Sequence, residues 1–133
     1  MSDCIFCKIA DKEIPSYIVW ENERFLVFAD AKPINPGHLL IIPKEHIDSI
    51  FDLPDERYAE IFMIAKTLFA PLRRATDAKR IGIAVEGFGV PHAHLHLVPL
   101  HGGNELNPER ARAMDEEELR KIANKIKEEI EKK

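Results

Sequence analysis

Residues 91–99, PHAHLHLVP, constrain the fold more than any other stretch of this chain, because histidines alternate there with apolar residues. His92, His94 and His96 recur with a period of two, the period of a β-strand, so one face carries three imidazoles and the other is apolar. Side chains two residues apart on a strand lie about 6.5–7 Å apart, close enough to act on neighbouring atoms of one ligand. We predict a strand over 93–99 with a functional histidine face.

Each of these histidines, taken alone, has a purely structural alternative. A single histidine on a strand is more often a hydrogen-bonded core or surface residue than a ligand or catalyst. Three on one face of a short segment are not typical of that role. An expression tag would place its histidines consecutively and at a terminus, whereas these are internal and alternate. The pattern therefore indicates a functional site.

Composition limits the class of protein. The chain has 133 residues, 45% hydrophobic and 32% charged, which is typical of one globular domain. A net charge of −4 argues against a protein that binds nucleic acid polymers through their backbone. The sequence shows neither a basic–apolar leader nor a run of 18 apolar residues, so we expect a cytoplasmic protein with no membrane partner.

Further strands are predicted at 17–21, 25–30, 39–43 and 81–85 from short apolar runs bounded by turn residues. Pro54 is expected to begin an amphipathic helix of about four turns, with an aromatic and aliphatic stripe in the core. Pro71 removes one helical hydrogen bond, so we expect the helix to kink or end there. Asp115 is expected to cap a final helix.

Cys4 and Cys7 are the two cysteines, and their C-x-x-C spacing indicates half of a zinc site or a redox pair. Zinc takes four ligands, so two more would have to come from elsewhere in the chain. His46 and one of the alternating histidines are the candidates. Two ordinary buried thiols are the alternative.

Several motifs together resemble the histidine triad (HIT) superfamily of nucleotide hydrolases and transferases. His92–Val98 fits its His-φ-His-φ-His-φ-φ signature, where φ is apolar. The order of the earlier motifs also matches the N-terminal half of the superfamily: CIFCKI at 4–9, EIP at 13–15, FAD at 28–30, PGH at 36–38 and IPKEHI at 42–47. The resemblance covers roughly residues 4–100.

The resemblance implies an α+β fold: a five-stranded antiparallel sheet with one long central helix, in a homodimer that joins two sheets. The five strands and the long helix predicted above are compatible with it. We therefore expect a single HIT domain over 1–133, with a core at 4–100 and a C-terminal helical extension at 107–133.

For the chemistry, the resemblance implies that His94 attacks the α-phosphorus of a nucleotide and forms a covalent nucleotidyl-histidine. A neutral imidazole is a nucleophile near pH 7. His96 would contact the phosphate or leaving group and could pass it a proton. The nucleotide-binding set that the resemblance implies comprises Asp30 for the ribose, an apolar base pocket, backbone near Gly89, and His38. The base pocket is Ile5, Phe6, Ile9 and Phe28, whose alternative role is plain core.

In superfamily members with C-x-x-C, zinc is held by that pair, a histidine of the Pro-Lys-x-His segment and the first triad histidine. Carried over to this chain, the ligands are Cys4, Cys7, His46 and His92. Four protein ligands leave no open position, so such a zinc would be structural, and no metal is needed for catalysis.

This sequence also departs from the superfamily. Val85 stands where many members have asparagine, and the short loop 87–91 lacks the Gln, Ser or Thr that many carry before the triad. The leading hypothesis is an enzyme that hydrolyses or transfers a nucleoside monophosphate, purine by resemblance, from a small conjugate. A zinc-stabilised dimeric nucleotide-binding or adaptor protein with little turnover is the alternative. A third is an enzyme with a catalytic zinc held by the histidines.

Overall fold

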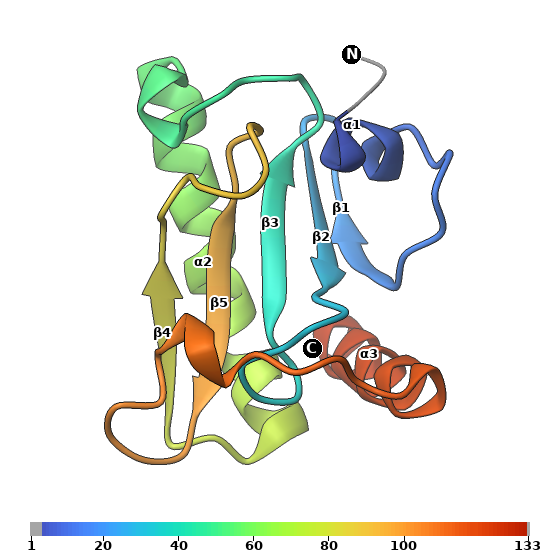
Figure 1. The fold of residues 1–133 in the computed structure, drawn as a ribbon. Helices are drawn as coiled ribbons and strands as arrows, with labels where there is room; N and C mark the ends of the chain where they lie inside the picture. The colour runs from blue at the N-terminus through green and yellow to red at the C-terminus, as the bar shows by residue number, and fades with distance from the viewer. Residues whose placement is uncertain (1–3, 133) are drawn as a thin grey trace.

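Five strands form one antiparallel sheet in the computed structural model, which describes residues 4–132 (Figure 1). Their spatial order is β1-β2-β3-β5-β4. The bounds are Ile18–Glu21 for β1, Phe25–Ala29 for β2, Leu39–Pro43 for β3, Arg80–Ala84 for β4 and Leu95–Leu100 for β5. The predicted fold class is thereby confirmed, with strand ends shifted by one or two residues.

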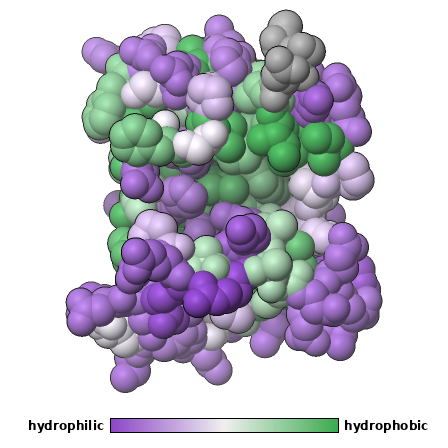
Figure 2. All heavy atoms as spheres, in the orientation of Figure 1, coloured by the Kyte–Doolittle hydropathy of each residue, from purple (hydrophilic) through white to green (hydrophobic). Residues whose placement is uncertain are grey.

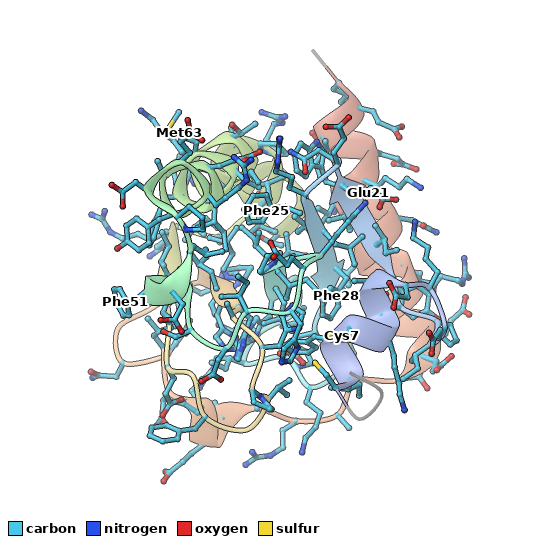
Figure 3. All side chains as sticks on the ribbon, turned by 90° about the horizontal axis from the view of Figure 1, so that it is seen from above. Cys7, Glu21, Phe25, Phe28, Phe51 and Met63 are labelled. Carbon is cyan, nitrogen blue, oxygen red and sulfur yellow. The ribbon has the colours of Figure 1, made fainter. Side chains whose placement is uncertain are left out.

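The two faces of the sheet have different covers. On one face pack α2 (Asp55–Thr76) and α3 (Glu116–Glu131), and the main core lies between them and the sheet. On the other face lie the short helix α1 (Ile5–Ala10) and, lower down, residues 101–115 (Figure 1). Seen from above, Phe25 lies on the α2 side and Phe28 on the α1 side (Figure 3). The strand alternation therefore separates a structural face from a second face that carries the site.

Helix α2 is longer than predicted. It continues through Pro71 without ending there and stops at Thr76, where Asp77 adopts a left-handed conformation with φ of 59°. Leu72 and Ala75, both beyond the proline, are buried against the sheet, and this burial offsets the roughly 3 kcal/mol that an interior proline costs. The expectation that the whole aromatic stripe is core was also wrong, because Tyr58 and Phe69 are 37% and 43% exposed.

The histidine segment is only partly strand. β5 begins at Leu95, so His92 and His94 lie in the chain just before it. The β4 neighbour stops at Ala84, opposite His96, and the N–H of Ala93 instead donates to the carbonyl of Ile47. The predicted strand over 93–99 was therefore too early at its start. The alternation still holds, because Ala93, Leu95 and Leu97 belong to the main core while the histidines face the other way.

The two shorter end helices differ in how far they could be foreseen. Asp115 caps α3 as predicted, accepting hydrogen bonds from the N–H groups of Glu117 and Glu118. Helix α1 was not predicted; Cys4 is its N-cap and accepts from the N–H of Cys7. No helix within residues 4–132 is long and apolar enough to span a bilayer.

Candidate functional site

A pocket of about 560 Å³ lies on the face of the sheet opposite α2, within the size range of ligand sites. Its upper wall is α1 and the loop after β4, its floor is β2, β3 and β5, and its lower wall is the segment after β5. Figure 2 shows apolar residues gathered across the middle of this face, with polar residues below them. His94 and His96 both line the pocket.

His94 has a fixed tautomer. Its Nδ1 lies 2.7 Å from the carbonyl oxygen of His92. A carbonyl oxygen only accepts, so Nδ1 carries a proton, and in the neutral tautomer that this selects the lone pair is on Nε2. The ring is held edge-on between Phe6 and His96, each with its ring centroid 5.1 Å away. The site therefore contains an oriented imidazole whose Nε2 is not used by the backbone hydrogen bond.

His96 has the opposite tautomer, set by a chain of hydrogen bonds. The backbone N–H of Ile34 donates to Nδ1 of His38 at 3.0 Å. The proton of neutral His38 is therefore on Nε2, which lies 2.9 Å from Nδ1 of His96 and donates to it. His96 then carries its own proton on Nε2. Two neighbouring imidazoles thus offer different groups, a lone pair on one and an N–H on the other.

His38 and His96 are both neutral at pH 7. Burial and then the neighbouring His96 lower the pKa of His38 to about 3. Burial and then His94 lower the pKa of His96 to about 4. Protonating His96 would also place an N–H on Nδ1 against the N–H of His38, so the hydrogen-bond chain opposes it. His96 is consequently a neutral hydrogen-bond donor, which refines the prediction that it passes a proton.

Asp30 follows the end of β2 and lines the same pocket. Its Oδ1 accepts from the N–H of Lys32 at 2.9 Å, and its Oδ2 lies 3.6 Å from Nε2 of His38. Burial raises the pKa of the Asp30 carboxyl, against the opposing hydrogen bond from Lys32. The carboxylate is thus partly desolvated and able to accept hydrogen bonds from hydroxyl groups of a ligand.

Cys4, Cys7, His46 and His92 form a second cluster, next to His94. Their ligand atoms all lie within 4.8 Å of one another. Nδ1 of His92 is 3.3 Å from Sγ of Cys4 and 3.5 Å from Sγ of Cys7, and Nδ1 of His46 is 3.1 Å from Sγ of Cys7. Tetrahedral zinc, with bonds of about 2.3 Å to sulfur and about 2.0–2.1 Å to nitrogen, places such atoms about 3.5 Å apart. The four residues therefore fit zinc.

The surroundings of the cluster support the same assignment. Nε2 of His92 lies 2.8 Å from the carbonyl oxygen of Pro43 and donates to it, which leaves Nδ1 free toward the cysteines. Burial, followed by the hydrogen bond and charge of Cys4, raises the pKa of the Cys7 thiol to about 11 in the metal-free protein. A metal that binds here therefore has to displace thiol protons.

The structure brings every predicted site residue to one of two adjoining places. The predicted catalytic and nucleotide-binding residues all line the pocket: Ile5, Phe6, Ile9, Phe28, Asp30, His38, Gly89, His94 and His96. The four predicted ligands form the cluster. Sequence reasoning missed the lower wall, made by Leu106, Pro108 and Ala111. Only the turn signal at Asn107–Pro108 marked that region, and a turn does not reveal what it covers.

Sequence comparison shows relatives in bacteria and yeast. A HIT-like protein of Borreliella burgdorferi is 36% identical over 124 residues, which span 82% of this chain and 89% of that protein. The adenosine 5′-monophosphoramidase HNT1 of Saccharomyces cerevisiae is 38% identical over 97 residues, which span 72% of this chain and 61% of that enzyme.

Solved structures agree with the sequence comparison. A HIT-like protein of Bartonella henselae superposes with a TM-score of 0.85 at 28% identity, covering 97% of each chain. A zinc-bound histidine triad protein of Mycobacterium smegmatis gives 0.84 at 27% identity and covers 97% of this chain and 94% of that one. The sequence profile of the HIT domain family matches residues 11–103, so this chain belongs to the HIT family.

Proposed function

We propose that this protein hydrolyses a small conjugate of a nucleoside monophosphate, or transfers its nucleotidyl group, through a covalent intermediate on His94. The observation that carries the proposal is the 2.7 Å hydrogen bond between Nδ1 of His94 and the carbonyl of His92, which selects the tautomer with its lone pair on Nε2, beside the pocket. A monophosphoramidase acting on adenosine 5′-conjugates among the relatives favours a purine nucleotide.

In the first step, Nε2 of His94 attacks the α-phosphorus. The N–P bond forms while the bond from phosphorus to the leaving atom breaks, and its electron pair goes to the leaving atom. Nε2–H of His96 hydrogen-bonds to that atom or to a phosphate oxygen as charge develops there. The leaving atom then takes a proton from solvent water.

In the second step, water attacks the same phosphorus, the N–P bond breaks, and its electron pair returns to Nε2 of His94. The attacking water releases one proton to the solvent, which balances the proton that the leaving atom took up in the first step. The products are a nucleoside monophosphate and the protonated leaving group; with an acceptor other than water, the same step is transfer. The loop after β4 can hold phosphate oxygens through its backbone N–H groups. Gly87 and Gly89 have φ of 91° and 89°, and no atom lies within 4 Å of where a Cβ would be, so the backbone stays open to a ligand.

We also propose that Cys4, Cys7, His46 and His92 hold a structural zinc. Four protein ligands fill a tetrahedral site, so the metal, when bound, supplies cross-linking free energy rather than a reactive position. It ties α1 to the segment before β5 and to the loop after β3. His94 and His96 are left for chemistry, because neither belongs to this cluster.

A homodimer is proposed from the free edge of the sheet. Within residues 4–132, β4 pairs with β5 alone, at the end of the strand order, and Ile83 and the adjoining Val85 are exposed. An unpaired edge with exposed apolar side chains is a ready surface for a second strand. Light scattering coupled to gel filtration tests this proposal, and a monomeric mass at micromolar concentration would reject it.

The central test uses an AMP conjugate and the His94→Ala variant. The native protein should accumulate, in mass spectrometry, an adduct with the mass of AMP on His94, and the variant should lose turnover while it keeps AMP binding and zinc content. AMP binding without turnover by the native protein would instead favour the binding or adaptor function. Loss of turnover with a chelator, in a protein that stays folded and binds AMP, would favour a catalytic metal.

A further inference from the structure

Residues 105–114, here called the strap, cross the face of the sheet between β5 and α3 (Figure 1). The strap includes the short 3-10 helix Pro108–Arg110, which Asn107 caps through its side chain. Leu106, Pro108 and Ala111 line the nucleotide pocket on the side opposite α1. This wall is not one of the HIT motifs, and none of its residues takes part in the chemistry proposed above.

Backbone hydrogen bonds hold the strap to the loop after β2. The N–H of Arg112 donates to the carbonyl of Pro33 at 3.2 Å, and the N–H of Met114 donates to the carbonyl of Ala31 at 3.1 Å. That loop also carries Lys32 and Ile34, which line the pocket, and Ile34 orients His38. The strap is therefore built onto the part of the chain that surrounds the ribose-binding carboxylate proposed above.

Asn35 is the central anchor of the strap. It is only 8% exposed, and all its side-chain hydrogen-bonding groups are used. Its Nδ2 donates to the carbonyl of Pro99 at 2.9 Å and to Oε1 of Glu105 at 3.0 Å, while its Oδ1 accepts from Nη2 of Arg110 at 2.8 Å. One buried amide thus joins β5, the start of the strap and the 3-10 helix. Removing it would leave buried partners unpaired.

Leu106 of the strap lies against β4, the strand that pairs with the strand of His96. A Cβ at Gly82 of β4 would lie 3.3 Å from Cδ2 of Leu106. Gly82 is two residues before Ala84, which pairs directly with His96, so Leu106 covers the position next to His96 on the same face. Residues i and i+2 of a strand lie about 7 Å apart. Leu106 therefore bounds the space beside the N–H that faces the leaving group.

We propose that Leu106 limits the size of the leaving group and that Asn35 is the positioning residue that holds Leu106 in place. The inference rests on the proposed function, because it takes the space beside His96 as the leaving-group side. It assigns the enzyme to conjugates with a compact leaving group. A conjugate with a bulky leaving group meets an apolar wall fixed to β4 and β5.

The first experiment compares two AMP amides, one releasing ammonia and one releasing a bulky aromatic amine. Leu106→Ala should raise the ratio of kcat/KM for the bulky amide over the small one by about tenfold, the lower range of discrimination by one or more methylene groups. Met63→Ala, an exposed apolar residue on α2 away from the pocket, is the matched control and should leave the ratio unchanged. An unchanged ratio in Leu106→Ala, with normal turnover of the small amide, overturns the inference.

Binding separates this inference from the proposed function. In the His94→Ala background, which forms no adduct, the ratio of dissociation constants for the two amides should shift in the same direction when Leu106→Ala is added. This readout does not depend on turnover. If the native protein shows no turnover and Leu106→Ala still shifts the binding ratio, the hydrolase function is rejected and the role of the strap stands. Turnover without a shifted ratio would do the reverse.

The role of Asn35 is tested by proteolysis and kinetics together. Trypsin cleaves after Arg110 and Arg112, both within the strap. Asn35→Ala should speed cleavage at these sites and raise KM for the small amide while kcat stays within about twofold. Arg110→Ala removes one of the two strap residues that hydrogen-bond to Asn35, leaves the buried amide and its bond to Glu105 in place, and should raise KM less. Equal cleavage after Arg112 in native protein and both variants, or a fall in kcat alone, would overturn the positioning role.

Discussion

Removal of the metal should weaken nucleotide binding, because α1 belongs to both sites. Its cysteines contribute to the metal cluster, and its apolar residues Ile5, Phe6 and Ile9 line the pocket. Six residues are too few for a helix to persist alone in water. Phe6 and Ile9 are buried against β2 and β3 and keep α1 partly docked. Loss of the metal should therefore loosen α1 without unfolding the domain.

The magnitude follows from the walls of the pocket. The apolar side chains that line the pocket at the end beside α1 come half from α1 and half from elsewhere: Ile5, Phe6 and Ile9 from α1, Phe28 and Leu40 from the sheet, and Val90 from the loop after β4. An aromatic side chain buries roughly 150–250 Å², so a nucleobase of similar size that loses half of this wall loses roughly 75–125 Å² of burial. At about 25 cal/mol per Å² this is about 2–3 kcal/mol. Partial docking favours the lower value, about 30-fold in Kd.

The assay is calorimetric titration of AMP into zinc-loaded protein, chelator-treated protein and the His46→Asn variant. His46 lies outside α1 and outside the pocket, so its loss weakens the metal site without changing the nucleotide contacts. We expect Kd to rise about 30-fold in both metal-free samples, with kcat much less affected, because His94 is oriented by a backbone carbonyl. By linkage, AMP should lower the Kd for zinc by the same factor. A change in Kd below about threefold, with zinc loss verified by atomic absorption, would refute the reasoning.

Three further outcomes are expected. His96→Asn should lower kcat by about 10²–10³-fold, measured in steady state, because the pocket loses the Nε2–H that donates to the leaving atom or to a phosphate oxygen; an effect on KM alone would contradict this. With chelator present, the free energy of unfolding, measured by urea titration, should fall as pH drops from about 6.5 to about 4. The reason is that the histidines of the unfolded chain gain protons first, while in the folded protein the pKa values of His38 and His96 are about 3 and about 4. The slope should flatten in His96→Asn, and an equal slope in both proteins would count against the buried neutral pair. Leu72→Ala should cost about 2–5 kcal/mol of stability in the same titration, because this fully buried residue lies on the part of α2 beyond Pro71; a cost below about 1 kcal/mol would show that this turn adds little.

The alternation at 91–99 predicted the two-faced arrangement because its cause is local. Successive side chains of an extended chain point to opposite sides whether or not the backbone is hydrogen-bonded in a ladder. For the same reason, it could not show that the ladder begins only at Leu95. The start of β5 depends on where β4 ends, which is a contact between segments distant in sequence.

Tertiary burial explains the other differences. Pro71 disfavours a helix locally, but Leu72 and Ala75 gain more from the core than the lost hydrogen bond costs. The strap is the largest part of the site that the sequence did not indicate. Its residues carry no chemistry, and only the fold brings Leu106 beside Gly82 and Asn35 beside Arg110.

His92 serves two neighbours through different atoms. Its ring belongs to the metal cluster, while its main-chain oxygen orients His94. Any amino acid at this position has that oxygen. Loss of the cysteines and replacement of His92 would therefore keep the backbone acceptor that orients His94. Conversely, loss of His94 would leave the four metal ligands in place. Because the side chain and the main-chain oxygen of His92 serve different sites, the metal cluster and the orientation of the nucleophile can be lost separately in evolution.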